Sequence, residues 1–188
     1  MGDGDESQDT AARRLRQLNA YFREHPVRGP EGHSYTRFSA HASTTAPGIP
    51  FNTRVSEHID ASVTEVVAHT RAANPDAGPA PTRADAVYDW AREHTRNAPE
   101  AEQFRRDMLE YRHYLEHAIA AGDTSVVRPH RCPDCRTVGL FWQEERGTVI
   151  CFNRRCAQAN GGIHRTHSLA RLAFEHVALQ RRLQACAT

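Results

Sequence analysis

Apolar residues recur at helical spacing in five segments of this chain. Such spacing places the apolar side chains on one face of a helix, which then packs against a neighbour. Three of the segments, within residues 56–123, are joined by short connections and therefore predict a small helical bundle. The five predicted helices run from Asp9 to Arg23, from Ser56 to Ala73, from Thr82 to His94, from Pro99 to Ala121, and from Thr166 or Ser168 to Gln184.

The segment between the first two predicted helices has no periodic pattern. Residues 25–55 contain four Pro and three Gly among many Ser, Thr and His. A stretch of this length and composition is typical of a functional loop, a disordered linker or an extended segment that wraps a partner. Ser56 is a favourable N-cap, so we expect the second helix to begin there. Residues 1–24 then hold a separate N-terminal helix.

The pattern changes after Val126. Two short apolar runs, Val138–Trp142 and Thr148–Phe152, are separated by Glu144-Glu145-Arg146-Gly147. Runs of this length around a polar turn that ends in Gly predict a β-hairpin. We therefore expect a mainly α protein, in which the helical bundle is followed over residues 124–188 by a small β-hairpin module and a C-terminal helix.

Four cysteines flank the predicted hairpin. Cys132 and Cys135 are separated by two residues, Cys151 and Cys156 by four, and fifteen residues lie between the pairs. A C-x2-C pair forms a tight knuckle that turns two sulfurs toward one ion, and two knuckles joined by a hairpin surround it. Because four thiolates select Zn²⁺ and leave no open coordination position, we predict one structural zinc per chain, held by all four cysteines.

Several alternatives to this ligand set stay open. The four-residue gap makes Cys156 the least typical ligand, and His130 or His164 could replace a cysteine. Four thiolates also bind iron, and the cysteines could instead be unliganded thiols or form a disulfide. Cys186 lies outside the pattern, and we expect it to be a free thiol.

The cysteine pattern also carries a family likeness. CPDC, a hairpin and CFNRRC together resemble a zinc ribbon. The wider run from Arg128, with HRCPDCRTVGLFW and HSLARLAFEH, resembles a group of uncharacterised proteins from actinomycetes and their phages and mobile elements, over about residues 50–180. That resemblance implies no activity. Zinc ribbons are similar to one another mainly in fold, and they serve as nucleic-acid binders, protein adaptors or structural staples.

Charge is divided unevenly along the chain. The net charge is only +1, yet residues 124–188 carry ten Arg and four acidic residues, and residues 1–123 carry fourteen Arg and nineteen acidic residues. The predicted zinc module is therefore the basic part of the protein. No Lys occurs anywhere, which together with the many Ala indicates a GC-rich genome and weakens any argument from a single Arg.

The basic residues of the module indicate a possible partner. Arg clusters interleaved with aromatic residues, here Phe141, Trp142 and Phe152, can follow phosphates and stack on bases. We therefore expect a non-enzymatic binding module for DNA or RNA. Alternatively, the Arg residues offset the negative charge of a four-thiolate zinc site, and the aromatics form the hairpin's small core. The candidate nucleic-acid contacts are Arg131, Arg136, Arg146, Arg154, Arg155 and Arg165.

One motif favours an enzyme. His113, Glu116 and His117 match the H-x-x-E-H pattern of inverted zincins. On a helical wheel both histidines lie opposite the apolar face that runs from Phe104 to Leu115, so we expect them to face solvent, without a cleft that excludes water. A metallohydrolase at this motif is therefore the remote alternative to a binding module.

The remaining features concern where the protein acts. No apolar run approaches the roughly 18 residues that span a bilayer, and the acidic N-terminus does not resemble a signal peptide. We therefore expect a cytoplasmic protein without a membrane partner, where reducing conditions keep thiols available for metal. A protein-interaction adaptor, with residues 25–55 wrapped around its partner, is the second functional hypothesis. The sequence leaves the oligomeric state open.

Overall fold

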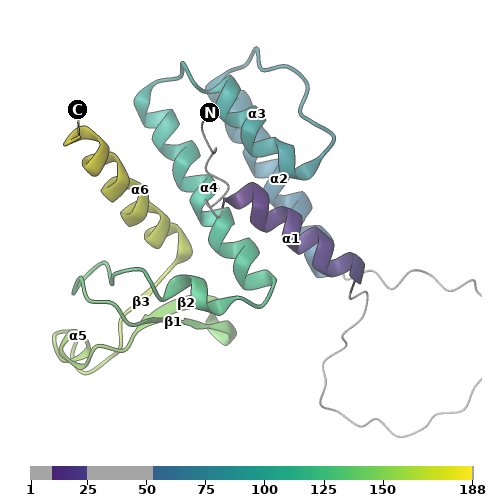
Figure 1. Ribbon diagram of the computed structural model, residues 1–188. Coiled ribbons are helices and arrows are strands. Elements are labelled where there is room, and N and C mark those ends of the chain that lie inside the picture. Colours follow the sequence, from purple (N-terminus) through teal and green to yellow (C-terminus); the bar gives the residue numbers. More distant parts are fainter. Residues whose placement is uncertain (1–9, 25–52, 188) are drawn as a thin grey trace, which may run out of the picture.

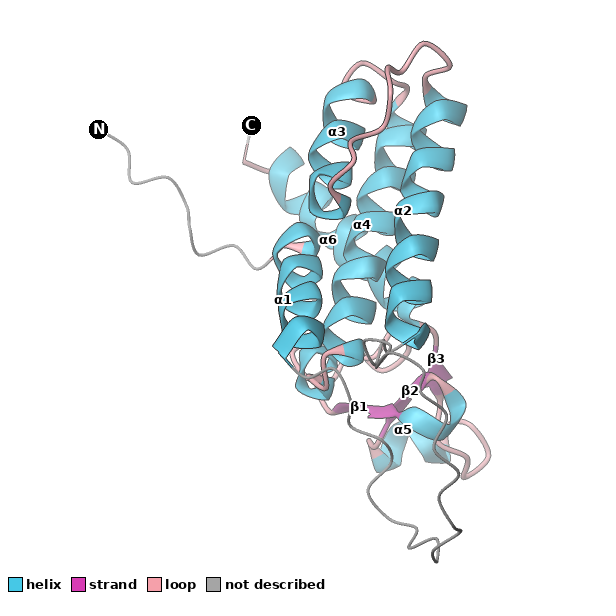
Figure 2. Ribbon diagram, turned by 90° about the vertical axis from the view of Figure 1, so that its right-hand side faces the viewer, coloured by secondary structure: helices cyan, strands magenta, loops and turns pink. Residues whose placement is uncertain are grey.

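The computed structural model describes residues 10–24 and 53–187. Over these ranges the chain is mainly helical, and a small three-stranded antiparallel sheet lies at one end of the helices (Figures 1 and 2). No helix of these two ranges is long and apolar enough to cross a membrane. Of the predicted linker 25–55, only residues 53–55 are described, and they are helical rather than part of a loop.

The helices form a bundle with α4 at its centre. α4 (Glu100–Ala120) packs against α1 (Ala11–Glu24), α2 (Thr53–Ala73), α3 (Val87–His94) and α6 (Leu169–Ala185). In Figure 1, α6 lies on one side of α4 and the first three helices lie on the other. α4 is therefore covered on two faces, although the sequence pattern predicted a single apolar face.

The predicted helices are present, with shifted ends. Leu15 and Leu18 of α1 are fully buried, as their spacing on one helical face predicts. The predicted N-cap at Ser56 is wrong, because α2 begins at Thr53 and Val55 already packs into the bundle. Gly122 follows α4 with a positive φ of 88°, a conformation that glycine adopts without strain, and it ends the helix as expected.

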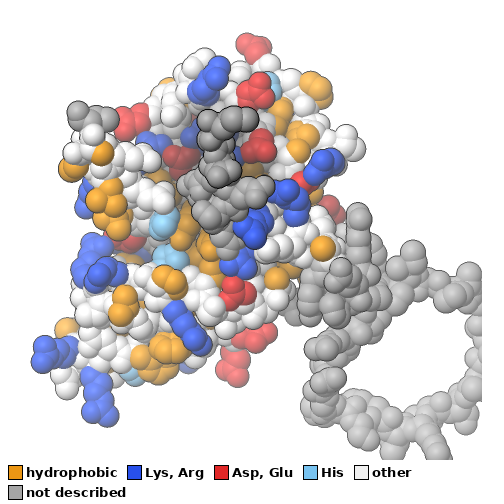
Figure 3. Space-filling view, viewed as in Figure 1, with side chains coloured by type: hydrophobic (Ala, Val, Ile, Leu, Met, Phe, Trp, Pro, Cys, Tyr) orange, Lys and Arg blue, Asp and Glu red, His pale blue; other side chains and the backbone are white. Residues whose placement is uncertain are grey.

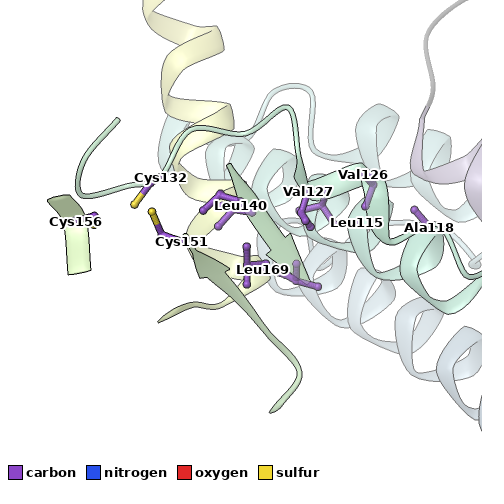
Figure 4. Packing of buried hydrophobic residues seen from close by; sticks show 11 residues of the cluster. Leu115, Ala118, Val126, Val127, Cys132, Leu140, Cys151, Cys156 and Leu169 are labelled. Atoms are coloured by element: carbon purple, nitrogen blue, oxygen red, sulfur yellow. The ribbon is translucent and has the colours of Figure 1, made fainter. Parts of the chain in front are cut away.

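The apolar core consists of two clusters that meet along α4. One cluster lies among α1, α2 and α3 and includes Leu15, Val66 and Val87. The other joins Leu115 of α4 to η2 (Thr124–Val127), the sheet and the start of α6 (Figure 4). Because this second cluster includes residues from both parts of the chain, the sheet is attached to the bundle by shared burial.

The predicted hairpin is confirmed and has a third strand beside it. β1 (Leu140–Gln143) and β2 (Thr148–Cys151) pair around η3 (Glu144–Arg146), and Gly147 turns the chain with a φ of 58°. β3 (Thr166–His167) pairs with the other edge of β2. The two-residue β3 was not predicted, because so short a strand has no periodic pattern.

The register of the sheet separates its two faces. Leu140 pairs with Cys151, and Val149 pairs with His167, and all four side chains are buried. Because side chains alternate along a strand, Phe141 lies on the opposite, outer face. That face is therefore turned away from the core formed with α4 and α6.

The last helix begins at one of its two predicted starts. The Oγ atom of Ser168 accepts a hydrogen bond from the backbone N–H of Arg171 (3.2 Å), so Ser168 is the N-cap of α6. The alternative start at Thr166 is wrong, because Thr166 belongs to β3. Leu169 and Leu172 then point into the core, and α6 returns along α4.

Candidate metal centre

The four predicted metal ligands come together. The Sγ atoms of Cys132, Cys135, Cys151 and Cys156 lie within 4.8 Å of one another. Those of Cys135 and Cys151 are 3.8 Å apart, about the edge length of a tetrahedron with metal–sulfur bonds of about 2.3 Å. All four are free thiols, so the alternative of a disulfide is not the arrangement found. This cluster could hold one metal ion, as the sequence spacing predicts.

Cys132 and Cys135 lie on a tight turn of the kind expected for a C-x2-C pair. The backbone N–H of Arg136 donates to the carbonyl of Cys132, and the N–H of Cys132 donates to the carbonyl of Thr137, both at 2.9 Å. Arg136 has a φ of +60°, which is uncommon for a residue with a Cβ. The Thr137 hydroxyl lies 3.0 Å from the Cys135 sulfur, where it can donate to a thiolate.

The second cysteine pair does not form a second knuckle, so that expectation is wrong. Cys151 ends β2, and Cys156 lies on the short helix α5 (Arg154–Gln158). The backbone N–H of Arg155 donates to the Asn153 side chain (3.0 Å), which caps α5. The four residues between Cys151 and Cys156 therefore connect the end of β2 to α5. The first turn of α5 brings Cys156 back to the other three cysteines.

Neither histidine considered as a substitute ligand joins the cluster. The Nε2 atom of His130 lies 2.8 Å from the Tyr111 hydroxyl, and the Nδ1 atom of His164 lies 2.9 Å from the carbonyl oxygen of Cys151. The histidine beside the sulfurs is His167, whose Nε2 atom is 3.4 Å from the Sγ of Cys132. Sequence reasoning missed it, because only the pairing of β3 with β2 brings it there.

The four thiols do not ionise equally easily without a bound cation. Burial, together with the neighbouring sulfurs, raises the pKa of Cys151 to about 12 and that of Cys156 to about 11. Burial also opposes ionisation of Cys135, but hydrogen bonds from Thr137 and the nearby thiols lower its pKa to about 6. Coordinating thiols lose their protons to a metal ion, so metal binding here should release protons and should weaken as the pH falls.

The cluster lies at the outer end of the second apolar core. Cys132, Cys151 and Cys156 are each at most 4% exposed and belong to the same buried cluster as Leu115 and Leu140. Figure 4 shows the sulfurs of Cys132 and Cys151 pointing toward each other, beyond the start of β1 and the end of β2. A metal bound to these thiols would therefore lie at the edge of the core that joins the sheet to α4 and α6.

The six candidate nucleic-acid contacts differ in their surroundings. Arg136 pairs with Glu175 (2.6 Å), and Arg165 pairs with Asp134 (3.1 Å). Arg131 donates to the backbone carbonyl of Arg136 (3.0 Å). Within the described residues, the other three are exposed and make no ion pair: Arg146 in η3, and Arg154 and Arg155 in α5.

The aromatic residues of the module divide between its two faces. Trp142 packs against the core, whereas Phe141 and Phe152 are 43% and 53% exposed. Their rings meet edge to face at 5.2 Å, and Phe152 also lies 5.1 Å from the ring of His164. The Arg128 guanidinium lies 5.7 Å from the centre of the Phe141 ring. We call Phe141, Phe152, His164 and Arg128 the outer sheet patch.

The two histidines of the H-x-x-E-H motif are buried, so the prediction that they face solvent is wrong. His113 and His117 are 1% and 0% exposed. The helical wheel failed because α2 and α3 cover the face of α4 that lies opposite α6. In the described ranges, these histidines do not gather with a third Cys, His, Asp or Glu closely enough to hold one ion.

The four-thiol cluster and the outer sheet patch are thus the features of the module that bear chemistry. Both consist of residues between positions 128 and 164, in and around the sheet. Comparisons with models of known protein families, with curated proteins and with solved structures find no match to this chain.

Proposed function

We propose that this protein is a non-enzymatic, zinc-stabilised module that binds single-stranded nucleic acid on the outer sheet patch. The observation that carries the proposal is the exposure of Phe141 and Phe152, side by side, on the outer face of the sheet. A module this small gains stability from every aromatic ring it buries. Two adjacent exposed rings are therefore typical of a binding surface.

Charge favours a polyanion as the occupant. Arg128 lies against the face of Phe141, where its guanidinium can pair with a phosphate while a base stacks on the rings. Arg154 and Arg155 follow Phe152 closely and have no carboxylate partner among the described residues. On the face seen in Figure 3, basic side chains surround the lower left of the molecule, with hydrophobic side chains exposed between them.

The exposed rings favour single strands over duplexes. Unpaired bases can stack on an aromatic side chain, and each such contact contributes about 1–3 kcal/mol. Bases of a duplex are already stacked on their neighbours and present only their edges in the grooves. A duplex would therefore gain from the Arg residues but not from Phe141 and Phe152.

The metal site supports this role by holding the patch in place. Its ligands Cys151 and Cys156 bracket the segment that carries Phe152, Arg154 and Arg155. Four thiolates without an open coordination position suit a structural zinc. The zinc would therefore position the binding residues without contacting the nucleic acid.

Fluorescence anisotropy with a labelled single-stranded oligonucleotide and its duplex tests the proposal. We expect the single strand to bind more tightly. Replacing both rings, Phe141→Ala with Phe152→Ala, should weaken single-strand binding by at least about 30-fold, because two stacking contacts are lost. Leu183→Ala removes an apolar side chain of α6 that is even more exposed, at 63%, and should leave binding unchanged.

The salt dependence provides a second arm of the same test. Single-strand affinity should fall with salt, with a slope of about −0.7 per neutralised phosphate on logarithmic axes. Arg154→Ala with Arg155→Ala should reduce that slope by about 1.4, whereas Arg71→Ala on α2 should not change it. A flat salt response, or no binding at low salt, would overturn the proposal and favour a protein partner for the patch.

A further inference from the structure

A continuous line of hydrogen-bonded side chains crosses the bundle. The Nε2 atom of His58 lies 2.9 Å from Nδ1 of His117, whose Nε2 atom lies 2.8 Å from the Tyr88 hydroxyl. That hydroxyl is 3.1 Å from Nδ1 of His113, whose Nε2 atom is 3.1 Å from Oε2 of Glu65. The residues come from α2, α3 and α4, and we call them the histidine chain.

The histidine chain has a buried middle and two more accessible ends. Tyr88, His113 and His117 are at most 2% exposed. His58 is partly buried, and the side chain of Glu65 is 47% exposed. Protons can therefore reach the ends of the chain more easily than its middle.

The Glu65 end sets the direction of the hydrogen bonds. Arg112 pairs with Glu65, and this hydrogen bond lowers the pKa of the carboxyl, so Glu65 can only accept. The Nε2 atom of His113 lies 3.1 Å from Glu65 and 3.2 Å from an Arg112 nitrogen. With a hydrogen on Nε2, both this atom and the Arg112 nitrogen donate to Glu65. A bare Nε2 would instead place two acceptors 3.1 Å apart that share the Arg112 nitrogen. We therefore place the hydrogen on Nε2.

The other hydrogens then follow one by one. With Nε2 of His113 protonated, its Nδ1 atom is an acceptor and takes the O–H of Tyr88. The Tyr88 oxygen accepts the Nε2–H of His117, and Nδ1 of His117 accepts the Nε2–H of His58. All three histidines are thus neutral and carry their hydrogen on Nε2. Each contact in the chain has one donor and one acceptor.

We propose that the histidine chain is a pH-sensitive lock, which holds α2 against α3 and α4 only while its histidines are neutral. A proton added to Nδ1 of His113 meets the O–H of Tyr88, and one added to Nδ1 of His117 meets the N–H of His58. Either addition replaces a hydrogen bond with two opposed donors and places a positive charge in the core. Acid therefore opens the contact between these helices.

The charged groups around the histidine chain offset such a proton only in part, because burial outweighs the attraction between Glu65 and His113. Those that face it are Glu65 on α2 and Arg112, Glu110 and Glu116 on α4. Glu65 pairs with Arg112, which also lies 3.3 Å from Glu116, and Glu110 pairs with Arg92 of α3. Each carboxylate thus already has a cationic neighbour. Burial accordingly lowers the pKa of His113 to about 4 and that of His117 to about 2.

Nitrogen-15 NMR of the metal-loaded protein tests the hydrogen positions directly. At pH 7.5, His58, His113 and His117 should all show the Nε2–H tautomer, and His113 and His117 should still be neutral at pH 5. A hydrogen on Nδ1 of His113 would overturn the assigned direction. A charged His113 in the folded protein at pH 5 would overturn the lock.

Native-state hydrogen exchange of α2 amides tests the opening. For each histidine that gains a proton on opening, the opening constant should rise by up to about tenfold per pH unit below pH 6.5. In His58→Gln, the amide N–H still donates to His117, but one titrating group is gone, so the rise per pH unit should be up to about tenfold smaller. His94→Gln changes a histidine of α3 that is not part of the histidine chain, so the opening constant should rise with acid as in the unchanged protein.

Two results would count against the lock. One is an opening constant that stays the same between pH 7 and pH 5, and the other is an equal effect of His58→Gln and His94→Gln. Elemental analysis excludes a hidden second metal site as the cause. The protein should hold one metal ion per chain, lost in Cys132→Ser and kept in His58→Gln, and a second ion lost with His58 would overturn the proposal.

Discussion

The metal module and the helical bundle handle buried polar groups in opposite ways. The module gathers four like ligands, the thiols of Cys132, Cys135, Cys151 and Cys156, around one point. The bundle instead lines up alternating donors and acceptors from His58 to Glu65, and each satisfies the next. Four thiolates repel one another unless a cation binds between them. The histidine chain needs no ion, because each of its acceptors already has a donor.

This difference predicts that the two parts fail under different conditions. Removing metal should disrupt the module and spare the bundle, and acid should open the histidine chain. Only the core shared through α4 connects the response of the module to metal removal with the response of the bundle to acid.

Metal removal should have the largest effect, and it should be local. A structural zinc contributes on the order of 10 kcal/mol to folding at pH 7. Chelation should therefore release residues 126–160 first, as measured by hydrogen exchange, and Cys151→Ser should abolish stoichiometric metal. Cys186→Ser, at an exposed thiol outside the cluster, should keep it. A hairpin that stays protected without metal would contradict the proposed structural role of the metal.

Lowering the pH should destabilise the bundle strongly. The folded pKa values of His113 (about 4) and His117 (about 2) lie below the unfolded value of about 6.5. Their contribution is therefore complete above pH 6.5 and is lost as the pH falls. Between pH 6.5 and 5, each histidine should cost about 2 kcal/mol. Exchange of α2 amides reports this loss, and a flat profile over that range would refute it.

A cavity in the shared core should weaken both parts together. Leu115 is fully buried and belongs to the cluster that joins α4 to the sheet. Leu115→Ala should lower the free energy of unfolding by about 2–5 kcal/mol, measured by urea denaturation with probes in each part. Leu183→Ala, on the exposed side of α6, should change it by less than about 0.5 kcal/mol. Loss confined to one probe would show that the parts fold separately.

Single hydroxyl deletions should give the smallest effects and distinguish the two parts. Tyr88→Phe leaves buried nitrogens of His113 and His117 without a partner and should cost about 1–3 kcal/mol. Tyr111→Phe removes a hydroxyl that contacts His130 at a less buried position, so solvent can replace it and the cost should be smaller. Equal losses of stability for the two substitutions in thermal denaturation would argue against a special role for the histidine chain.

Several elements could be predicted from the sequence because their signals are local. The apolar spacing of Leu15 and Leu18 marks one helix face, and Gly122 marks a helix end. The spacing of Cys132 and Cys135 predicts a knuckle, because two intervening residues are enough to turn both sulfurs toward one ion. Each of these signals depends on residues only a few positions apart.

Other features depended on contacts between distant segments. A helical wheel cannot show that α2 and α3 cover His113 and His117, so their burial was predicted incorrectly. Alternation along a strand separates Phe141 from Trp142, but it does not tell which of them faces the core. His167 reaches Cys132 only through a two-residue strand, and His58 reaches His117 across a separation of 59 positions.

By itself, the sequence determined that the protein is mainly helical, that a hairpin follows the bundle and that four cysteines can converge on one ion. These follow from periodicity and spacing, which act within one element or across one turn. Only the tertiary structure decided which aromatic rings are exposed, which arginines are left unpaired and how the histidines connect. Burial and pairing depend on which elements cover a given face, and that is a property of the packed chain as a whole.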